Sequence, residues 1–408
     1  MNILYIDHYA GSPTYGMEFR PYYLSREWVK QGHNVTIIGS SFSHLRQRNP
    51  GVPKDFQEEI IDGIKYVWLK GNTYKGSISR IRNILSFVGK LQRNAKRIAS
   101  LYKPDLVIAS STYPLDNIPA HKIAKYSGAQ YTYEVHDLWP LSPMEIGGYS
   151  KWHPFIMIMQ WAENYAYKHV DKVVSLLSNS EEHMLEHGLG EGKFVCVPNG
   201  YNPDEWTTER INMPLPDEHK KAFEALKGKT IVGFAGGFVA SGALHTLIKA
   251  ASNLREISEL HFVLVGKGPE RENYDKIIQE EGLSNVTILG PVQKKSIPSL
   301  VANFDICYFG GVHSVLHKYG SAANKMTDYM LSSKPIVHSA DEPTSLTRKL
   351  GCGIWVTAEN VEAVTDAIRK ISNMSEEERM RMGKLGRDYA LNNLSWPTLA
   401  ERFINAFK

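Results

Sequence analysis

The sequence predicts an α/β protein made of two doubly wound, Rossmann-like domains. The chain has 408 residues, which is too long for one ordinary domain. Short apolar runs alternate with helical stretches, a pattern typical of parallel sheets covered on both faces. This series begins twice, at Ile3–Ile6 and at Ile231–Phe234, and each start is followed by a glycine-bearing loop and a helix. We therefore expect one sheet in each half of the chain.

In the first half, apolar runs predict strands at Ile3–Ile6, Val35–Ile38, Asp105–Ala109, Tyr131–Val135, Lys172–Leu176 and Phe194–Val197. Asp62-Gly63, between Ile60–Ile61 and Tyr66–Leu69, predicts a hairpin. In the second half we expect strands at Ile231–Phe234, His261–Val265, Asn285–Leu289, Ile306–Phe309 and Pro335–His338. Helices are expected at Leu244–Leu254, Tyr274–Glu281, Ser296–Val301, Lys325–Ser332 and Val361–Ile371.

A polar, proline-bearing stretch from Asn202 to Lys229 separates the two series. We place the first domain at residues 1–205, joined by a C-terminal helix at about 391–408, and the second domain at residues 206–390. In such folds ligands bind beyond the carboxyl ends of the strands, so two facing domains would enclose a cleft.

The composition excludes several classes of protein. With 42% apolar and 22% charged residues, the chain is in the globular range. No apolar run approaches the roughly 18 residues of a membrane-spanning helix, and the first residues lack a signal-peptide pattern. The three cysteines are far apart, which supports neither a disulfide framework nor a CxxC metal site. We expect a cytoplasmic protein.

The segment from Lys70 to Pro104 has nine basic residues and no acid. It has helical periodicity, with an apolar face from Ile84 to Tyr102. Two interpretations stay open: the solvated edge of a packed helix, or a cationic surface that binds anionic lipid. The cations assigned to that surface are Lys90, Arg93, Lys96 and Arg97. Nucleic acid is not favoured, because no aromatic platform or reading helix accompanies the charge.

Two glycine-bearing loops are candidate anion sites. Gly16 ends the loop after the first strand, and Gly237 ends Ala235-Gly236-Gly237 after the first strand of the second domain. Glycines permit close approach of an anion to backbone N–H groups. Neither loop has the GxGxxG or P-loop pattern, and plain turns would fit equally well.

Lys325 and Asp328 are three residues apart at the start of an expected helix. A cation there opposes the helix dipole, which makes sense if Lys325 serves a bound anion. Asp328 would then be placed to accept hydrogen bonds from a ribose diol. The alternative is an ion pair within the helix.

His136 follows a first-domain strand, where a side chain can reach into a cleft. It could orient or deprotonate an acceptor hydroxyl, or it could be held by a local carboxylate such as Asp137. No metal site is predicted, because Asp-x-Asp is absent and the pair His183 and His187 has no apparent third ligand.

Several motifs together resemble family 4 retaining glycosyltransferases of the GT-B fold. Val197-Pro198-Asn199-Gly200-Tyr201 resembles the family's "PNG(V/Y)" signature. Other matching segments are residues 16–21, 32–35, 41–46, 136–140, 266–269, 324–330 and 394–396. The matches at 32–35, 41–46 and 136–140 resemble the branch of bacterial fucosamine transferases. The resemblance spans nearly the whole chain.

The resemblance implies a role for each matching position. Asp328 would bind the ribose, where the family usually has glutamate, and Val292 would meet the base through its backbone. The diphosphate would be held by Lys325 and by amides near Gly16 and Gly237, with Asn324 beside them. His136 would lie by the acceptor and the transferred sugar. Glu18, Arg20 and Asp137 would bind the acceptor.

The implied reaction is metal-independent transfer, with retention, from a UDP-sugar to a polyprenyl-diphosphate-linked glycan. It would take place at the inner face of the membrane during assembly of O-antigen or capsule. Two features depart from the pattern: Gly320 replaces the first acid of the Glu-x7-Glu motif, and Gly237 and Ser241 replace a basic pair. A nucleotide-sugar epimerase and a non-catalytic homologue that partners an active transferase therefore remain alternatives.

Overall fold

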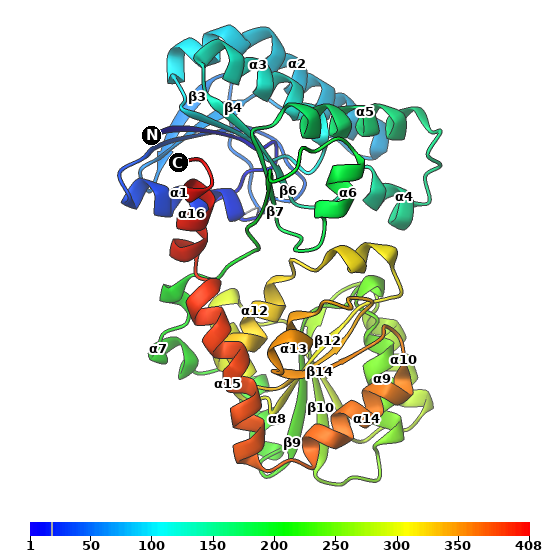
Figure 1. The fold of residues 1–408 in the computed structure, drawn as a ribbon. Coiled ribbons are helices and arrows are strands. Elements are labelled where there is room, and N and C mark those ends of the chain that lie inside the picture. Colours follow the sequence, from blue (N-terminus) through cyan, green and yellow to red (C-terminus); the bar gives the residue numbers. More distant parts are fainter. Residues whose placement is uncertain (18) are drawn as a thin grey trace. The chain divides into compact units, whose positions relative to one another are not determined.

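The structure, a computed structural model, describes residues 1–17 and 19–408. The chain divides into two compact units (Figure 1). Unit 1 comprises Met1–Asn199 and Trp396–Lys408, and unit 2 comprises Gly200–Ser395. Each unit contains one sheet with helices on both of its faces, as expected for a doubly wound fold (Figure 1).

The sheet of unit 1 has eight strands in the order β3-β4-β2-β1-β5-β6-β7-β8. Only the pairing of β3 with β4 is antiparallel, and it forms the predicted hairpin, whose turn residues Asp62 and Gly63 have positive φ. The strands are β1 Asn2–Ile6, β2 Asn34–Ser40, β3 Gln57–Ile61, β4 Ile64–Leu69, β5 Leu106–Ala109, β6 Gln130–Val135, β7 Lys172–Ser175 and β8 Phe194–Cys196.

The helices of unit 1 are α1 Arg20–Lys30, α2 Ser77–Tyr102, α3 Asn117–Ser127, α4 Leu141–Gly147, α5 Pro154–His169, α6 Glu181–Glu186 and α16 Trp396–Asn405. The predicted apolar face of α2 is confirmed, because Ile84, Phe87, Leu91 and Ile98 are all buried. Of the helices that the structure describes, including α2 with its 26 residues, none is both long enough and apolar enough to cross a bilayer.

The sheet of unit 2 has six parallel strands in the order β11-β10-β9-β12-β13-β14. The strands are β9 Thr230–Gly237, β10 Leu260–Lys267, β11 Val286–Leu289, β12 Ile306–Gly310, β13 Ile336–Ser339 and β14 Gly353–Val356. The helices are α7 Thr208–Ile211, α8 Asp217–Ala225, α9 Leu244–Asn253, α10 Arg271–Glu280, α11 Ile297–Ala302, α12 Asn324–Leu331, α13 Leu346–Leu350, α14 Val361–Ser372 and α15 Glu376–Asn393.

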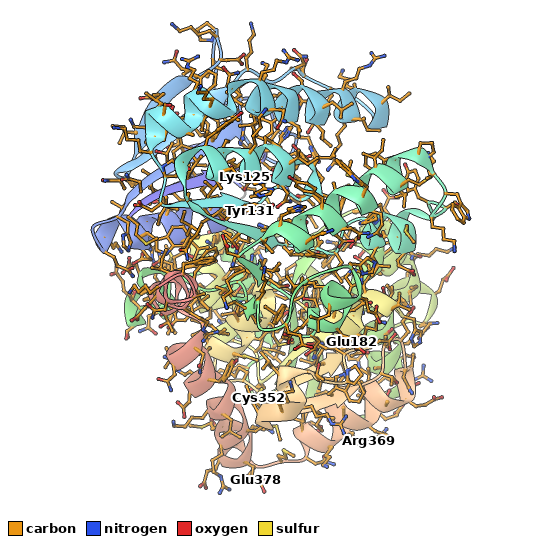
Figure 2. All side chains as sticks on the ribbon, turned by 45° about the horizontal axis from the view of Figure 1, so that its top comes forward. Lys125, Tyr131, Glu182, Cys352, Arg369 and Glu378 are labelled. Carbon is orange, nitrogen blue, oxygen red and sulfur yellow. The ribbon has the colours of Figure 1, made fainter. Side chains whose placement is uncertain are left out.

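Both units have dense apolar interiors. Figure 2 draws the described side chains, among them Tyr131 on β6, which is buried in unit 1, and Cys352, which is buried in unit 2. Val263 and Leu264 of β10 point to opposite sides of their sheet and are both buried. This burial on both faces explains why the sheet strands are continuous apolar runs in the sequence.

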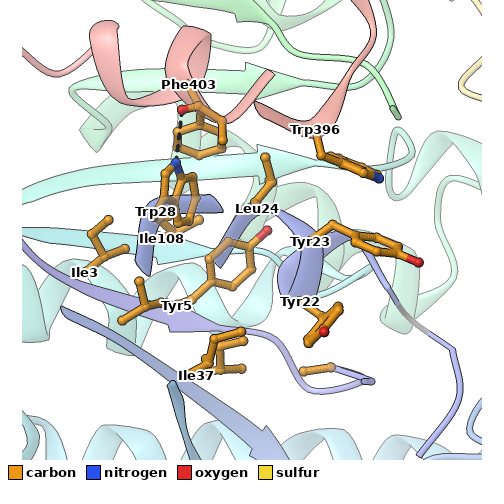
Figure 3. Close-up of a cluster of buried hydrophobic side chains, with 14 of the residues drawn as sticks. Ile3, Tyr5, Tyr22, Tyr23, Leu24, Trp28, Ile37, Ile108, Trp396 and Phe403 are labelled. Carbon is orange, nitrogen blue, oxygen red and sulfur yellow. Dashed lines mark hydrogen bonds between the residues drawn. The ribbon is translucent and has the colours of Figure 1, made fainter. Parts of the chain in front are cut away.

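The C-terminal helix α16 packs in the core of unit 1, against α1 (Figure 3). Trp396 stacks on Tyr23, with ring centroids 5.4 Å apart, and Phe403 meets the edge of Trp28 at 5.1 Å. Trp28 Nε1 donates to the carbonyl of Ala400 at 3.0 Å. Helix α16 therefore completes the core of unit 1, whose other residues all come from Met1–Asn199.

Replacing Phe403 with alanine is expected to destabilise unit 1 by ~3–5 kcal/mol, because it leaves a cavity beside Trp28. Urea unfolding followed by tryptophan fluorescence measures this loss. Glu401→Ala, on the exposed side of the same helix, is the matched control and should leave the unfolding midpoint unchanged. Equal midpoints for the two variants would mean that α16 does not support the core.

Candidate functional site

Lys325 lies in the first turn of α12, at the end of the sheet of unit 2 where the strands finish. Its Nζ is 4.8 Å from the ring centroid of Phe234 on β9 and 5.2 Å from that of Phe309 on β12. A Cβ atom at Gly236 would lie 3.4 Å from the same nitrogen. Two aromatic faces therefore hold the ammonium group directly beside the glycine turn that follows β9.

Within the described part of the chain, Lys325 forms no ion pair and no hydrogen bond to another side chain. The predicted alternative of an ion pair with Asp328 is therefore not found. Burial lowers the pKa of the Lys325 ammonium, as expected for a cation without a nearby acid. A half-buried cation in this state is well placed to bind an anionic ligand.

Asp328 is one turn further along α12, in a setting that disfavours its charge. Burial, aided by the negative charge of Glu205, raises the pKa of the Asp328 carboxyl to about 7, although Lys294 and a hydrogen bond from Trp206 act in the opposite direction. Lys294 Nζ is itself 3.0 Å from Glu205 Oε2. Glu205 and Trp206, before the sheet of unit 2, and Lys294, after β11, therefore set the pKa of the Asp328 carboxyl.

Three other predicted donor residues, Gly237, Asn324 and Val292, also belong to unit 2, whereas Gly16 belongs to unit 1. Gly237 is the last residue of β9 and is exposed, with only Val239 Cγ1 near its would-be Cβ, at 3.8 Å. Asn324 begins α12 and is exposed. Val292 is half-buried in the loop after β11, two residues before Lys294, whose charge acts on Asp328. The structure thus brings these positions to one end of unit 2.

In unit 1, His136 directly follows β6 and lies above a buried acid. Its Nε2 is 2.8 Å from Ser110 Oγ and 3.4 Å from Glu134 Oε2. Glu134 is fully buried, and it also accepts hydrogen bonds from Tyr5, Ser110 and Arg20. The predicted alternative, a histidine held by a local carboxylate, finds such a group in Glu134, which projects from the same face of the strand, and the charge of His136 also acts on Asp137.

Burial alone would raise the pKa of the Glu134 carboxyl, but Arg20, His136 and Ser110 outweigh it and hold that pKa well below its usual range. The carboxylate is therefore charged at neutral pH. It can fix the orientation of the imidazole and stabilise its protonated form. Sequence reasoning missed Glu134, although its i, i+2 spacing from His136 on a predicted strand was a usable signal.

Arg20 differs from its predicted role in acceptor binding. The side chain is only 4% exposed, with Nε 2.9 Å from Glu134 Oε1. Its Nη1 and Nη2 donate to the carbonyls of Pro198 and Val197, both at 2.8 Å. The guanidinium is thus committed to the protein interior, and we reinterpret Arg20 as a positioning residue. It joins the start of α1 to the Pro-Asn-Gly segment.

The loop before α1 is shaped by close backbone packing. Gly16 has φ +80°, and a Cβ there would lie 2.9 Å from Gln47 Cγ. At Gly11, which sequence reasoning did not single out, a Cβ would lie 1.9 Å from the Met17 carbonyl oxygen. Arg46 Nε donates to the Ala10 carbonyl at 2.7 Å. Glu18, a predicted acceptor contact, lies outside the described residues.

The four cations predicted to face a membrane are not equivalent. Lys90 Nζ is 2.7 Å from Asp55 Oδ1, and the Arg97 guanidinium lies 4.4 Å from the ring centroid of Phe56. Arg93 and Lys96 are exposed. Half of this set therefore makes contacts with the protein's own surface.

No metal site was predicted at His183 and His187, because no third ligand was apparent, but the structure places Glu163 beside them. Ligand atoms of Glu163, His183 and His187 all lie within 4.8 Å of one another. Glu163 Oε1 is 3.3 Å from His183 Nε2 and accepts a hydrogen bond from Tyr167 at 3.0 Å. His187 Nδ1 is 2.7 Å from the carbonyl oxygen of His183. These hydrogen bonds are sufficient to explain why the three side chains lie together in the interior.

Two sequence models of protein families match the chain in succession. The family described as Glycosyltransferase Family 4 matches residues 15–205, and the one described as Glycosyl transferases group 1 matches residues 216–389. The structure of sucrose-phosphate synthase from Thermosynechococcus elongatus aligns with 100% of this chain and 98% of its own, at a TM-score of 0.72 and 16% identity. The chain is a glycosyltransferase of the GT-B fold.

Two further proteins resemble this glycosyltransferase. The putative colanic acid biosynthesis glycosyl transferase WcaI of Escherichia coli K12 is 22% identical over 74% of this chain and 74% of its own. The structure of Anabaena HepE with UDP and glucose covers 100% of this chain and 99% of its own, with a TM-score of 0.66 and 15% identity. The match of the group 1 family spans the edge of unit 2 that carries Lys325 and Asp328.

Proposed function

We propose that this glycosyltransferase transfers a sugar from a UDP-sugar to a hydroxyl of a polyprenyl-diphosphate-linked glycan, with retention of anomeric configuration. The pathway would be the assembly of a bacterial surface polysaccharide, O-antigen or capsule, at the inner face of the cell membrane. The name of WcaI, which refers to colanic acid biosynthesis, supports this assignment. The observation that supports a donor site most strongly is the position of Lys325 beside the glycine turn of β9, without an ion-pair partner among the described residues.

The donor's diphosphate is proposed to bind at Lys325 and the backbone amides near Gly237. Negative charge grows on the leaving diphosphate as the sugar–oxygen bond breaks, so a fixed cation lowers the barrier. Asp328 would accept hydrogen bonds from the ribose. The HepE structure with UDP and glucose supports UDP as the nucleotide, and resemblance to fucosamine transferases makes an N-acetylated amino sugar the candidate donor sugar.

The acceptor is proposed to bind in unit 1, near His136 and Asp137. The contacts of His136 with Ser110 and Glu134 orient the ring, which would hydrogen-bond an acceptor hydroxyl or the transferred sugar.

The reaction would need no metal, because Lys325 supplies the positive charge. Treatment with EDTA is therefore expected to leave the transfer rate unchanged.

The direct test is a transfer assay with a panel of nucleotide sugars and lipid-linked glycans extracted from bacterial membranes. We expect label from one UDP-sugar in the lipid fraction, with the new linkage in the donor's anomeric configuration by NMR. Interconversion of the donor sugar without an acceptor would support the epimerase instead. Absence of both reactions and of nucleotide binding would support the non-catalytic homologue.

UDP affinity should depend on pH through Asp328. The pKa of this carboxyl is about 7, and ribose hydroxyls prefer the ionised form as acceptor. Lowering the pH from about 8 to about 6 is therefore expected to weaken binding about tenfold, as protonation competes with the nucleotide. Calorimetric titration measures this. Asp328→Asn is the matched control for ionisation of the nucleotide's own phosphate, and identical pH profiles for both proteins would contradict the ribose role.

A further inference from the structure

Unit 1 contains a cavity of about 590 Å³ beside the end of β6. It lies between the N-terminal part of α2 and the α4–α5 segment, and its wall is largely apolar. Residues on the wall include Ile78, Ile81, Ile84, Trp139, Ile146 and Phe155. Asp137, the neighbour of His136, also lines it, so the cavity adjoins the proposed acceptor site. Its size suits a small molecule or a lipid chain.

The cavity wall also carries a cation without an acidic partner. Arg80 lines the cavity, and among the described residues it forms no ion pair. Its Nε is buried without a hydrogen-bond partner, and the guanidinium lies 5.9 Å from the ring centroid of Tyr9. The half-buried guanidinium also acts on the Tyr9 hydroxyl but has no acidic partner among the described residues, so an anionic ligand would compensate its charge. The cavity therefore fits a molecule that joins hydrocarbon to an anionic group.

The α4–α5 segment, which forms part of the cavity wall, exposes large apolar side chains. Ile146 on α4 is 79% exposed, and Trp152, in the loop between α4 and α5, is 72% exposed. Trp161 on α5 is 56% exposed, next to exposed Met157 and Ile158, although the opposite face of α5 is already buried in the core. An apolar patch with two tryptophans is typical of a protein surface that meets lipid.

The charge near this rim matches an anionic surface. The stretch from Lys70 to Pro104 has no acid, and Arg82 of α2 is exposed close to the cavity-lining residues Ile81 and Ile84. This basic, N-terminal half of α2 is distinct from the half that carries Lys90 and Arg97, whose side chains contact Asp55 and Phe56.

We propose that the cavity binds the hydrocarbon of an isoprenoid phosphate lipid, with Arg80 on the phosphate. Ile146, Trp152 and Trp161, called the apolar rim below, enter the bilayer around it. This inference rests on the proposed function in taking a glycan linked to such a lipid as the sugar acceptor. It places the main membrane contact at α4–α5 and not at Lys90–Arg97. One surface would then both attach the enzyme to the membrane and place the glycan beyond the phosphate near His136.

Flotation of the full-length protein with phosphatidylcholine vesicles, with and without phosphatidylglycerol or polyprenyl phosphate, tests the inference. The rim variant Trp152→Ser/Trp161→Ser should bind all these vesicles about tenfold or more weakly than the wild type. The control Met380→Ser, at an apolar side chain 61% exposed in unit 2, should float like the wild type. Arg80→Gln should keep phosphatidylcholine binding and lose the gain from polyprenyl phosphate.

Several results would overturn the inference. One is unchanged flotation of the rim variant, and another is a larger loss in a Lys90→Glu/Lys96→Glu variant than in the rim variant. Self-association of the wild type that disappears in the rim variant, with no flotation of either, would make the rim an interface between copies. UDP titration on the same proteins separates the two proposals. Normal UDP binding without flotation refutes only the lipid site, and flotation without UDP binding refutes only the transferase assignment.

Discussion

Replacing Lys325 with alanine is expected to lower kcat/KM for the sugar nucleotide by ~10²–10³, with no change in the fold. The ammonium group is held at the end of β9 by the rings of Phe234 and Phe309, and among the described residues it has no acidic partner that its loss would leave unpaired. Its removal therefore acts on the bound diphosphate and not on stability. The loss should fall on both KM and kcat, because the diphosphate is charged when it binds and gains further charge in the transition state.

Two variants make this result interpretable. Lys276→Ala, which removes an exposed lysine paired with Glu280 on α10, should retain the wild-type kcat/KM. Lys325→Arg keeps the charge but moves it, and should recover part of the rate. A wild-type kcat/KM in the Lys325→Ala enzyme would contradict the proposed role of α12 in donor binding.

Replacing Glu134 with glutamine is expected to destabilise unit 1 by ~3–5 kcal/mol, because it leaves Arg20 charged and buried without its partner. Arg20 and Glu134 side chains are only 3% and 0% exposed. The pKa of Glu134 lies below its ordinary value of 4.5. The pair's stabilisation is therefore fully present above about pH 4.5 and is lost as the pH falls further towards the folded-state pKa. The deficit of Glu134→Gln should shrink over the same acidic range.

Urea unfolding measured from neutral to acidic pH checks both parts of this prediction. Glu58→Gln, which alters an exposed pair with Lys65, should change stability by less than ~1 kcal/mol. The double variant Arg20→Met/Glu134→Leu should cost less than the sum of its single variants, with a coupling of ~0.5–3 kcal/mol. Additive effects, or a deficit that does not change with pH, would mean that the pair is not an interacting unit.

Much of the fold was predictable because these sheets bury their strands on both faces. Strands such as β9 and β10 are continuous apolar runs with a glycine-bearing loop after them. The missed strand β14 has four residues and lies at the edge of its sheet, where all of them are only half-buried. The missed helix α15 has a mostly polar sequence, and its start is marked by a capping box from Ser375 to Glu378.

The end of the chain differs from its prediction. A single terminal helix at about 391–408 was expected, but α15 ends at Asn393 and α16 begins at Trp396. The sequence signals the break weakly, through Pro397 in the first turn of α16.

The site was predictable to the extent that it depends on local spacing. The separation of Lys325 and Asp328 predicts one helix turn, but not that Lys325 stays unpaired, because this depends on Phe234 and Phe309 from two distant strands. The family motif at residues 16–21 led to the prediction that Arg20 binds the acceptor. Its buried partner Glu134 is 114 residues away in the chain, a distance over which spacing carries no information.

The central claim is that α12 and the end of β9 form the donor nucleotide site. Calorimetric titration with UDP, GDP and dTDP, on the wild type, Lys325→Ala and Asp328→Ala, tests it most directly. We predict that UDP binds the wild type in preference to the other two, and that both variants lose most of this affinity. UDP binding that is unchanged in both variants, or no binding of any nucleotide to the wild type, would contradict the claim.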